Sequence, residues 1–164
     1  MPLSYVSALP EPTRRLVATR VGVPPVAYED VRDALATHLQ RTARAGADLC
    51  RLLGMTSTWN TTRWEPGSSS DALLPSFRIT VKGHVPDHET TEIIGRRLAQ
   101  QGWNGAVLSR EPVFRIDAHR ETASMTLTAA ENMVCLALHE TPVRLDRTLA
   151  SWILAGAFED DETT

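Results

Sequence analysis

The alternation of apolar and polar residues between positions 114 and 139 constrains the fold more than any other feature of this sequence. Three short segments, separated at 120–121 and 130–131, place an apolar residue at every second position, which is the period of a β-strand with one buried face. If tight turns centre on those two sites, the facing pairs are Asp117 with Ser124, Ile116 with Met125, and Met125 with Leu136. One face then carries Phe114, Ile116, Ala118, Ala123, Met125, Leu127, Val134, Leu136 and Leu138. A slip of one residue would mix the faces, so the pattern predicts a three-stranded antiparallel meander.

A long helix and two strands are expected ahead of this meander. From Glu29, apolar and small residues recur at three- and four-residue steps as far as Leu53, and Gly54 supplies a C-terminal stop. The segment "STWNTTRW" (57–64) alternates β-branched and aromatic residues, as does "SFRITVK" (76–82), and both predict strands. The Gly-, Pro- and Ser-rich stretch between them is typical of a loop.

Two more helices complete the pattern. Asp87 is a suitable N-cap for a central helix that ends at Gly102, after which Trp103 leads into a strand at 106–108. Apolar residues at helical spacing mark a C-terminal helix: Leu145, Leu149, Trp152, Ile153 and Gly156. Strands that cluster and are joined by short turns predict an α+β fold, with an antiparallel sheet of five to six strands and three helices packed on it. The expected organisation is an extended Pro-rich arm (1–27), one domain (28–158) and an acidic tail (159–164).

Charge and hydropathy exclude several classes of function. The net charge is −3 and the arginines are spread along the chain, so no nucleic-acid partner is expected. No stretch reaches the roughly 18 apolar residues of a membrane-spanning helix, so no transmembrane segment is expected. The Pro-rich start fits a mature domain from which a signal or lipid anchor was removed, and it equally fits a cytosolic protein.

Two groups of polar residues suggest a metal site and a catalytic site, but neither group meets the requirements of its site. His84 and His88 are four residues apart, yet Pro86 and the helix start fall between them and no third ligand is evident, so no metal or other cofactor is expected. Asp117, His119 and Ser124 fall on one face of neighbouring strands, which offers neither a pocket nor an oxyanion site. We therefore expect no catalytic residues.

The two cysteines leave two interpretations open. Cys50 lies on the first helix and Cys135 on the last strand of the meander. They either close a long loop as a disulfide in an oxidising compartment or remain two buried thiols. The predicted register places Cys135 on the face opposite the main core, so a disulfide requires the first helix to cover that face.

Tryptophans mark the candidate partner surface. Trp103 and Trp152 are expected to fill the core, whereas Trp59 and Trp64 lie on opposite faces of one predicted strand. One of them is therefore a candidate for exposure, and with Arg63 they form the predicted surface for a protein partner.

The order of "LAQQGW", a strand, a meander and a final "LHETPV" resembles small actinobacterial lipoproteins of the LppA-like kind. The resemblance covers about residues 28–143 and is architectural; Val143 stands where the family pattern has a cysteine, a helix follows, and there is no lipobox. It implies an exported, non-catalytic protein of the cell envelope. Any association with the membrane would be only through a lipid anchor that the given sequence no longer carries.

We therefore expect a non-enzymatic domain that binds a protein partner, in an extracytoplasmic location. The alternative is a cytosolic inhibitor of the toxin-immunity or phage-associated type. A small hydrolase is the third hypothesis, and it requires a deep pocket with convergent polar groups.

Overall fold

The computed structural model describes residues 28–57 and 59–156. The predicted arm and acidic tail lie outside the described residues. The described residues form two compact units: 28–38, 64–74 and 142–156 make the first, and 39–57, 59–63 and 75–141 make the second. Helix α3 and strands β1 and β2 contribute residues to both units.

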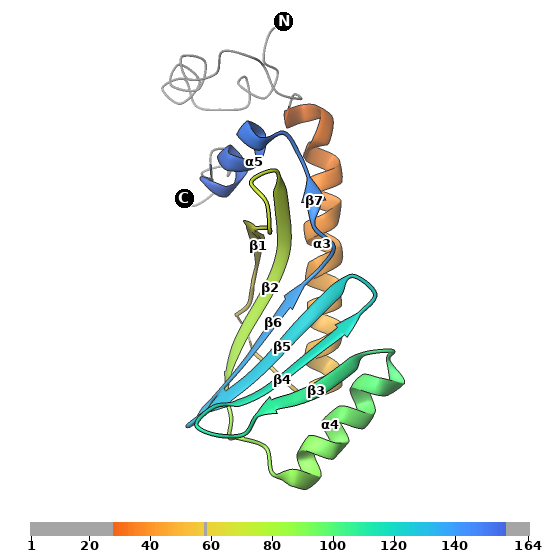
Figure 1. Ribbon diagram of the computed structural model, residues 1–164, viewed down its shortest axis with the longest axis vertical. Coiled ribbons are helices and arrows are strands. Elements are labelled where there is room, and N and C mark those ends of the chain that lie inside the picture. Colours follow the sequence, from red (N-terminus) through yellow and green to blue (C-terminus); the bar gives the residue numbers. More distant parts are fainter. Residues whose placement is uncertain (1–27, 58, 157–164) are drawn as a thin grey trace, which may run out of the picture. The chain divides into compact units, whose positions relative to one another are not determined.

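The fold is α+β, as the sequence predicts. In the described chain the elements follow the order α3 (Tyr28–Leu53), β1 (Thr61–Pro66), β2 (Ala72–Lys82), α4 (His88–Gln100), β3 (Asn104–Ser109), β4 (Phe114–Arg120), β5 (Ala123–Ala130), β6 (Met133–His139), β7 (Val143–Arg144) and α5 (Arg147–Leu154). The strands form one seven-stranded sheet in the order β1-β2-β6-β5-β4-β3, and β7 also pairs with β2 (Figure 1). The two-residue β7 was not expected, because so short a strand leaves no periodic signal.

The meander β4–β5–β6 has the predicted faces but not the predicted register. Ala118 pairs with Met125 and Met125 with Leu138, so each hairpin is displaced by two residues from the expected pairing. The two-residue loops begin at Glu121 and Glu131, whose φ angles are +53° and +52°, one position later than expected. A shift of two residues leaves every side chain on its face, which is why the predicted buried set is still correct.

The core of the second unit lies between this sheet and α3. The buried face of β4, β5 and β6 packs with Phe77 and Ile79 of β2 and with Leu49 and Cys50 of α3. Gly46 allows the close approach of the helix, because a Cβ atom there would lie 2.2 Å from the ring of Phe77. The glycine therefore seats α3 directly on an aromatic ring that is 2% exposed.

Two helices of this unit end in the same way. At the end of α4, the Gly102 N–H donates to Ala99 and the Trp103 N–H donates to Leu98, with Gly102 at φ +80°. These two bonds make a Schellman motif, and the two residues it joins, Trp103 and Leu98, are both buried in the core. The segment "LAQQGW" thus ends the helix, and its tryptophan packs into the core.

The end of α3 repeats this arrangement. Gly54 has φ +68°, its N–H donates to Arg51, and the Met55 N–H donates to Cys50. Met55 and Cys50 are again core residues, so the apolar residue after each glycine ties the helix end to the interior.

The first unit contains β7 and α5. Asp146 caps α5 by accepting from the backbone N–H groups of Thr148 and Leu149. Arg144 of β7 donates to the carboxylate of Asp71, 3.2 Å away, beside the paired residues of β7 and β2. Leu149 is fully buried, in agreement with the predicted apolar stripe of the C-terminal helix.

Candidate functional site

A groove rich in arginine lies in the second unit beside α3. Its volume is about 600 Å³. Its charged and polar lining consists of Arg41, Arg44, Arg51, Arg120, Asp48 and Gln101. We call this site the arginine groove. Its apolar floor consists of Ala45, Leu49, Leu52 and Trp103.

Helix α3 supplies one wall of the arginine groove. Arg41, Arg44, Asp48 and Arg51 follow one another at three- and four-residue steps, so they share a helix face. Arg51 forms an ion pair with Asp48. Arg41 and Arg44 are exposed, and neither forms a hydrogen bond or ion pair with another residue in the part of the chain that the structure describes.

The opposite wall holds Arg120 in a fixed position. Its guanidinium carbon lies 4.8 Å from the centre of the Trp103 ring, and its Nη1 donates to the carbonyl oxygen of Gln101 at 3.2 Å. Stacking on an indole and donation to a helix-terminal carbonyl both hold a guanidinium in one orientation. Four cations and one anion therefore line the groove, in a protein whose net charge is −3.

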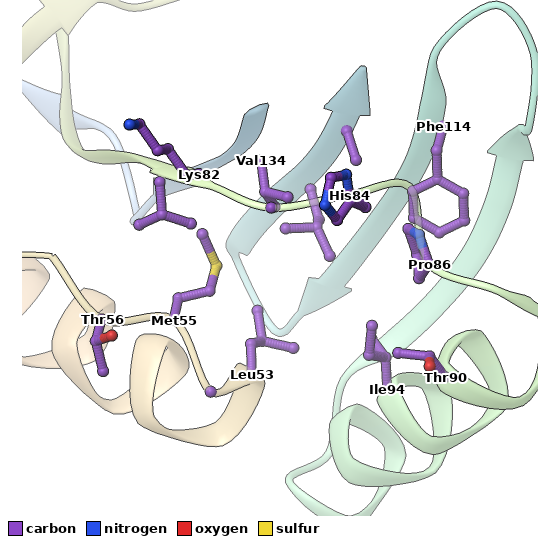
Figure 2. Close-up of a pocket in the computed structure, with 15 residues that line it drawn as sticks. Leu53, Met55, Thr56, Lys82, His84, Pro86, Thr90, Ile94, Phe114 and Val134 are labelled. Carbon is purple, nitrogen blue, oxygen red and sulfur yellow. The ribbon is translucent and has the colours of Figure 1, made fainter. Parts of the chain in front are cut away.

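A second cavity, of about 410 Å³, lies at the ends of α3 and β2 and the start of α4 (Figure 2). We call it the apolar pocket. Leu53 and Met55 line it from the end of α3, Ile94 from α4, and Phe114 and Val134 from the sheet. His84 lies at its edge on the segment that follows β2, and Lys82, the last residue of β2, lines it with its side chain directed away (Figure 2); none of the lining residues is acidic.

On the polar face of the meander, the carboxylate of Asp117 is bound by two neighbouring side chains. Asp117 accepts from Arg115 Nε and Nη2, each at 2.9 Å, and from Thr126 at 3.0 Å. These bonds, those from Arg115 foremost, hold the pKa of Asp117 below its usual value. His119 does lie opposite Ser124, but no hydrogen bond joins them among the described residues, and the carboxylate is engaged elsewhere.

The two histidines that are four residues apart lie in different surroundings. His88 pairs with Glu92 at 3.3 Å on α4, whereas His84 stands at the apolar pocket. Within residues 28–57 and 59–156, no group of three or more His, Cys, Asp or Glu residues is placed to hold a metal ion.

The Cys50–Cys135 disulfide is not formed. Cys50 is in the core, whereas Cys135 lies on the opposite face of the sheet, where its Sγ is 3.4 Å from the hydroxyl of Thr80. Both thiols are free. Helix α3 packs on the core face and not on the face of Cys135, which is the condition that the disulfide required.

The predicted tryptophan surface is divided. Trp59 is 69% exposed but precedes β1, because the strand begins at Thr61 and not at 57 as expected. Trp64 is half-buried in the first unit, where its ring meets His38 edge-on with 6.5 Å between the centres. Trp59 and the exposed Arg63 belong to the second unit. The partner surface of Trp59, Arg63 and Trp64 stays a prediction.

Neither cavity was expected from the sequence. The arginine groove does leave a signal, since Arg41, Arg44 and Arg51 share a helix face. That face does not stand out in the sequence because arginines are spread along the whole chain. The apolar pocket leaves none, because its lining residues carry the same letters as the core.

No family model and no curated protein matches this chain. One solved structure, that of a Mycobacterium tuberculosis protein called LppA and assigned as a lipoprotein, matches 86% of this chain and 95% of its own at 15% identity, with a TM-score of 0.36. This is the weak architectural resemblance that residues 28–143 suggested, and it assigns no function. Within the described ranges, no helix has both the length and the hydropathy needed to cross a membrane.

Proposed function

We propose that this protein is a non-enzymatic binding domain whose arginine groove receives an acidic segment of a protein partner. The observation that carries the proposal is the gathering of four guanidinium groups around one groove of about 600 Å³. Two of these groups, on Arg41 and Arg44, form no ion pair with another described residue. A partner that supplies carboxylates would pair with them.

The chemistry of the groove favours a peptide over other anions. Guanidinium groups bind carboxylates through two parallel hydrogen bonds, so several arginines select spaced acidic side chains. The apolar floor adds a place for an aliphatic side chain between them. Asp48 would repel a densely charged nucleic acid, which also gains nothing from a protein of net charge −3.

Exposed ion pairs contribute only about 0.2–1 kcal/mol each, so no single arginine is expected to carry the affinity. Arg120 differs from the other three arginines because its guanidinium is already oriented before a ligand arrives. We infer moderate affinity with a marked dependence on salt, since the groove is open to solvent and its charges are screened by ions.

The test is selection from a random 12-residue peptide library on the full chain, followed by calorimetry with the selected peptides. Acidic peptides with interspersed aliphatic residues are expected, and their affinity should fall at least about tenfold in Arg41→Glu/Arg44→Glu. The matched control is Arg96→Glu/Arg110→Glu, which changes the net charge equally at exposed positions that do not line the groove.

Equal losses in the two double variants would show that net charge and not the groove attracts the peptides. Selection of neutral or basic peptides would contradict the proposal outright. Tighter binding of a single-stranded oligonucleotide than of any peptide would replace it with a polyanion site.

The cellular location and biological role of such a domain remain predictions, with two alternatives. Export as an envelope protein is the favoured one, although the free thiols remove the disulfide that export was expected to bring. A cytosolic inhibitor of the immunity type is the other, and an arginine groove suits it equally. The absence of catalysis also remains a prediction; Asp117 bonds to Arg115 and Thr126 and not to His119.

A further inference from the structure

We propose that a hollow on the face of the sheet opposite α3 is a second binding site, which takes a short dicarboxylate between Arg78 and Arg115. The hollow has a volume of about 370 Å³. We call it the polar hollow. It shares no lining residue with the arginine groove, so the two proposals can fail independently of each other.

The side chains that line the polar hollow project from the sheet face that does not carry the core. Phe77 and Ile79 are core residues, so Arg78 and Thr80, which alternate with them along β2, point the opposite way. The hydroxyl of Thr80 lies 3.4 Å from the Sγ of Cys135 on β6, which places that thiol on the same face.

The polar hollow forms because long side chains on two outer strands flank short side chains on the two strands between them. Strands β2, β6, β5 and β4 lie side by side in that order (Figure 1). Arg78 stands on β2 and Arg115 on β4. The side chains between them in the paired rows are all short: Thr126 and Thr128 on β5, and Cys135 and Ala137 on β6. The floor is thus built on paired strands, so the hollow is present before a ligand binds.

Arg115 is held at one end of the polar hollow. Its Nε and Nη2 donate to the carboxylate of Asp117 on the same strand, each at 2.9 Å. A guanidinium has more N–H groups than this pairing uses, so others remain for a ligand. Strands β2 and β4 are separated by three strand spacings, or about 14 Å. Because Arg115 stays over β4, a ligand that meets both arginines must carry anionic groups at its two ends.

The charges on this face favour an anion. Arg78 and Arg115 line the hollow, and Lys82 follows on the same face of β2. Asp117 offsets one of these three positive charges but does not line the hollow, and none of the lining residues is acidic. A ligand with two negative charges therefore matches the net charge of these four groups.

The other polar groups of the lining suit carboxylates. The hydroxyl of Thr128 is on the half-buried floor and forms no hydrogen bond with another described residue. Guanidinium groups bind carboxylates through two parallel hydrogen bonds, to which a threonine hydroxyl can add a third donor. The volume is near the lower end of the range of roughly 300–1,000 Å³ for small-molecule sites, so the occupant is a small molecule and not a peptide segment.

An NMR titration of the isotope-labelled full chain with adipate tests the site. The amide signals of Thr128, Cys135 and Ala137 are expected to shift. Hexanoate, which has one carboxylate, should bind at least about fivefold more weakly because it meets only one arginine. Inorganic phosphate should also bind at least about fivefold more weakly, because so compact an anion cannot reach both ends of the hollow.

Two variants separate the charge from the space. Arg78→Gln should weaken adipate at least about fivefold, whereas Arg110→Gln removes the same charge at an exposed position outside the hollow and should bind normally. Ala137→Phe should fill the floor and weaken adipate at least about tenfold. Asn104→Phe adds a ring at an exposed position that does not line the hollow, and it should bind normally.

The thiol on the floor gives an independent measurement. Adipate that occupies the hollow should slow the reaction of Cys135 with iodoacetamide and leave the rate at Cys50, in the core, unchanged. Circular dichroism of each variant shows whether it is folded before its binding is judged.

Three results would overturn the proposal. The first is the absence of any shift with adipate in the unchanged protein. The second is a set of shifts confined to residues of the arginine groove, since a dicarboxylate would then bind there alone. The third is normal binding of adipate by folded Arg78→Gln and Ala137→Phe variants. Tighter binding of phosphate than of adipate would likewise replace the dicarboxylate with a compact oxyanion, and the proposal would be wrong.

Discussion

Replacing Gly46 by alanine is expected to destabilise the protein, although alanine is the better helix former. In α3 the Cβ of this alanine would lie 2.2, 2.4 and 2.5 Å from three ring atoms of Phe77. The ring is 2% exposed and belongs to the core, so it has no free space to enter. Either the ring or the helix must move, and both are held by the surrounding packing.

The magnitude follows from two opposing terms. Overpacking of a closed core typically costs about 1–3 kcal/mol, and contacts this short place Gly46→Ala near the upper end. Removal of a helical glycine returns about 0.5–1 kcal/mol. The net loss is therefore about 2 kcal/mol, which corresponds to a Tm lower by roughly 4–8 °C for a chain of this size.

Gly95 in α4 provides the matched control. A Cβ there meets nothing within 4 Å, so Gly95→Ala should keep only the helix term and gain about 0.5–1 kcal/mol. Urea unfolding of both variants measures the difference in sign. The double variant Gly46→Ala/Phe77→Leu should lose less than the sum of its single changes, because the smaller side chain relieves the clash. Equal stability of Gly46→Ala and Gly95→Ala would refute the close packing of α3 on Phe77.

Two further predictions concern pH and thiol chemistry. Because Arg115 lowers the folded-state pKa of Asp117, this carboxylate stabilises the fold above the ordinary aspartate pKa of roughly 4 and loses that effect as pH falls through its lowered pKa. Asp117→Asn should therefore be less stable at pH 7, and its free energy of unfolding should fall less steeply in acid. Urea unfolding at a series of pH values measures this, and an equally steep fall in the two proteins would contradict it. Burial raises the pKa of the Cys50 thiol, so at pH 8 Cys135 should react first with iodoacetamide, and mass spectrometry that finds Cys50 labelled at the same rate or earlier would show that the core assignment of Cys50 is wrong.

Most of the fold can be predicted from the sequence because it depends on local periodicity. The apolar residues of β4, β5 and β6 identify the buried face, and that result survives even though both hairpins pair two residues away from the expected register. Periodicity of two cannot detect an even shift, and the turn geometry that decides it depends on the positive φ of Glu121 and Glu131. Likewise, Gly54 and Gly102 mark helix ends in the sequence, since glycine readily adopts the conformation that ends a helix there.

The sites depend on distances that no local pattern records. Arg44 and Arg120 line one groove although one is on a helix and the other ends a strand far along the chain. The lining of the apolar pocket is indistinguishable in sequence from the core, because only the positions of two helix ends leave it open. Cys50 and Cys135 were left with two interpretations for the same reason.

By itself, then, the sequence determined the elements, their buried faces and the glycines at which helices stop, because each follows from residues within a few positions of one another. Only the tertiary structure decided the hairpin registers, the separation of the two thiols by a sheet, and the two cavities. Each of these is set by how α3, α4 and the meander of the second unit pack, and packing brings together residues whose separation along the chain carries no signal.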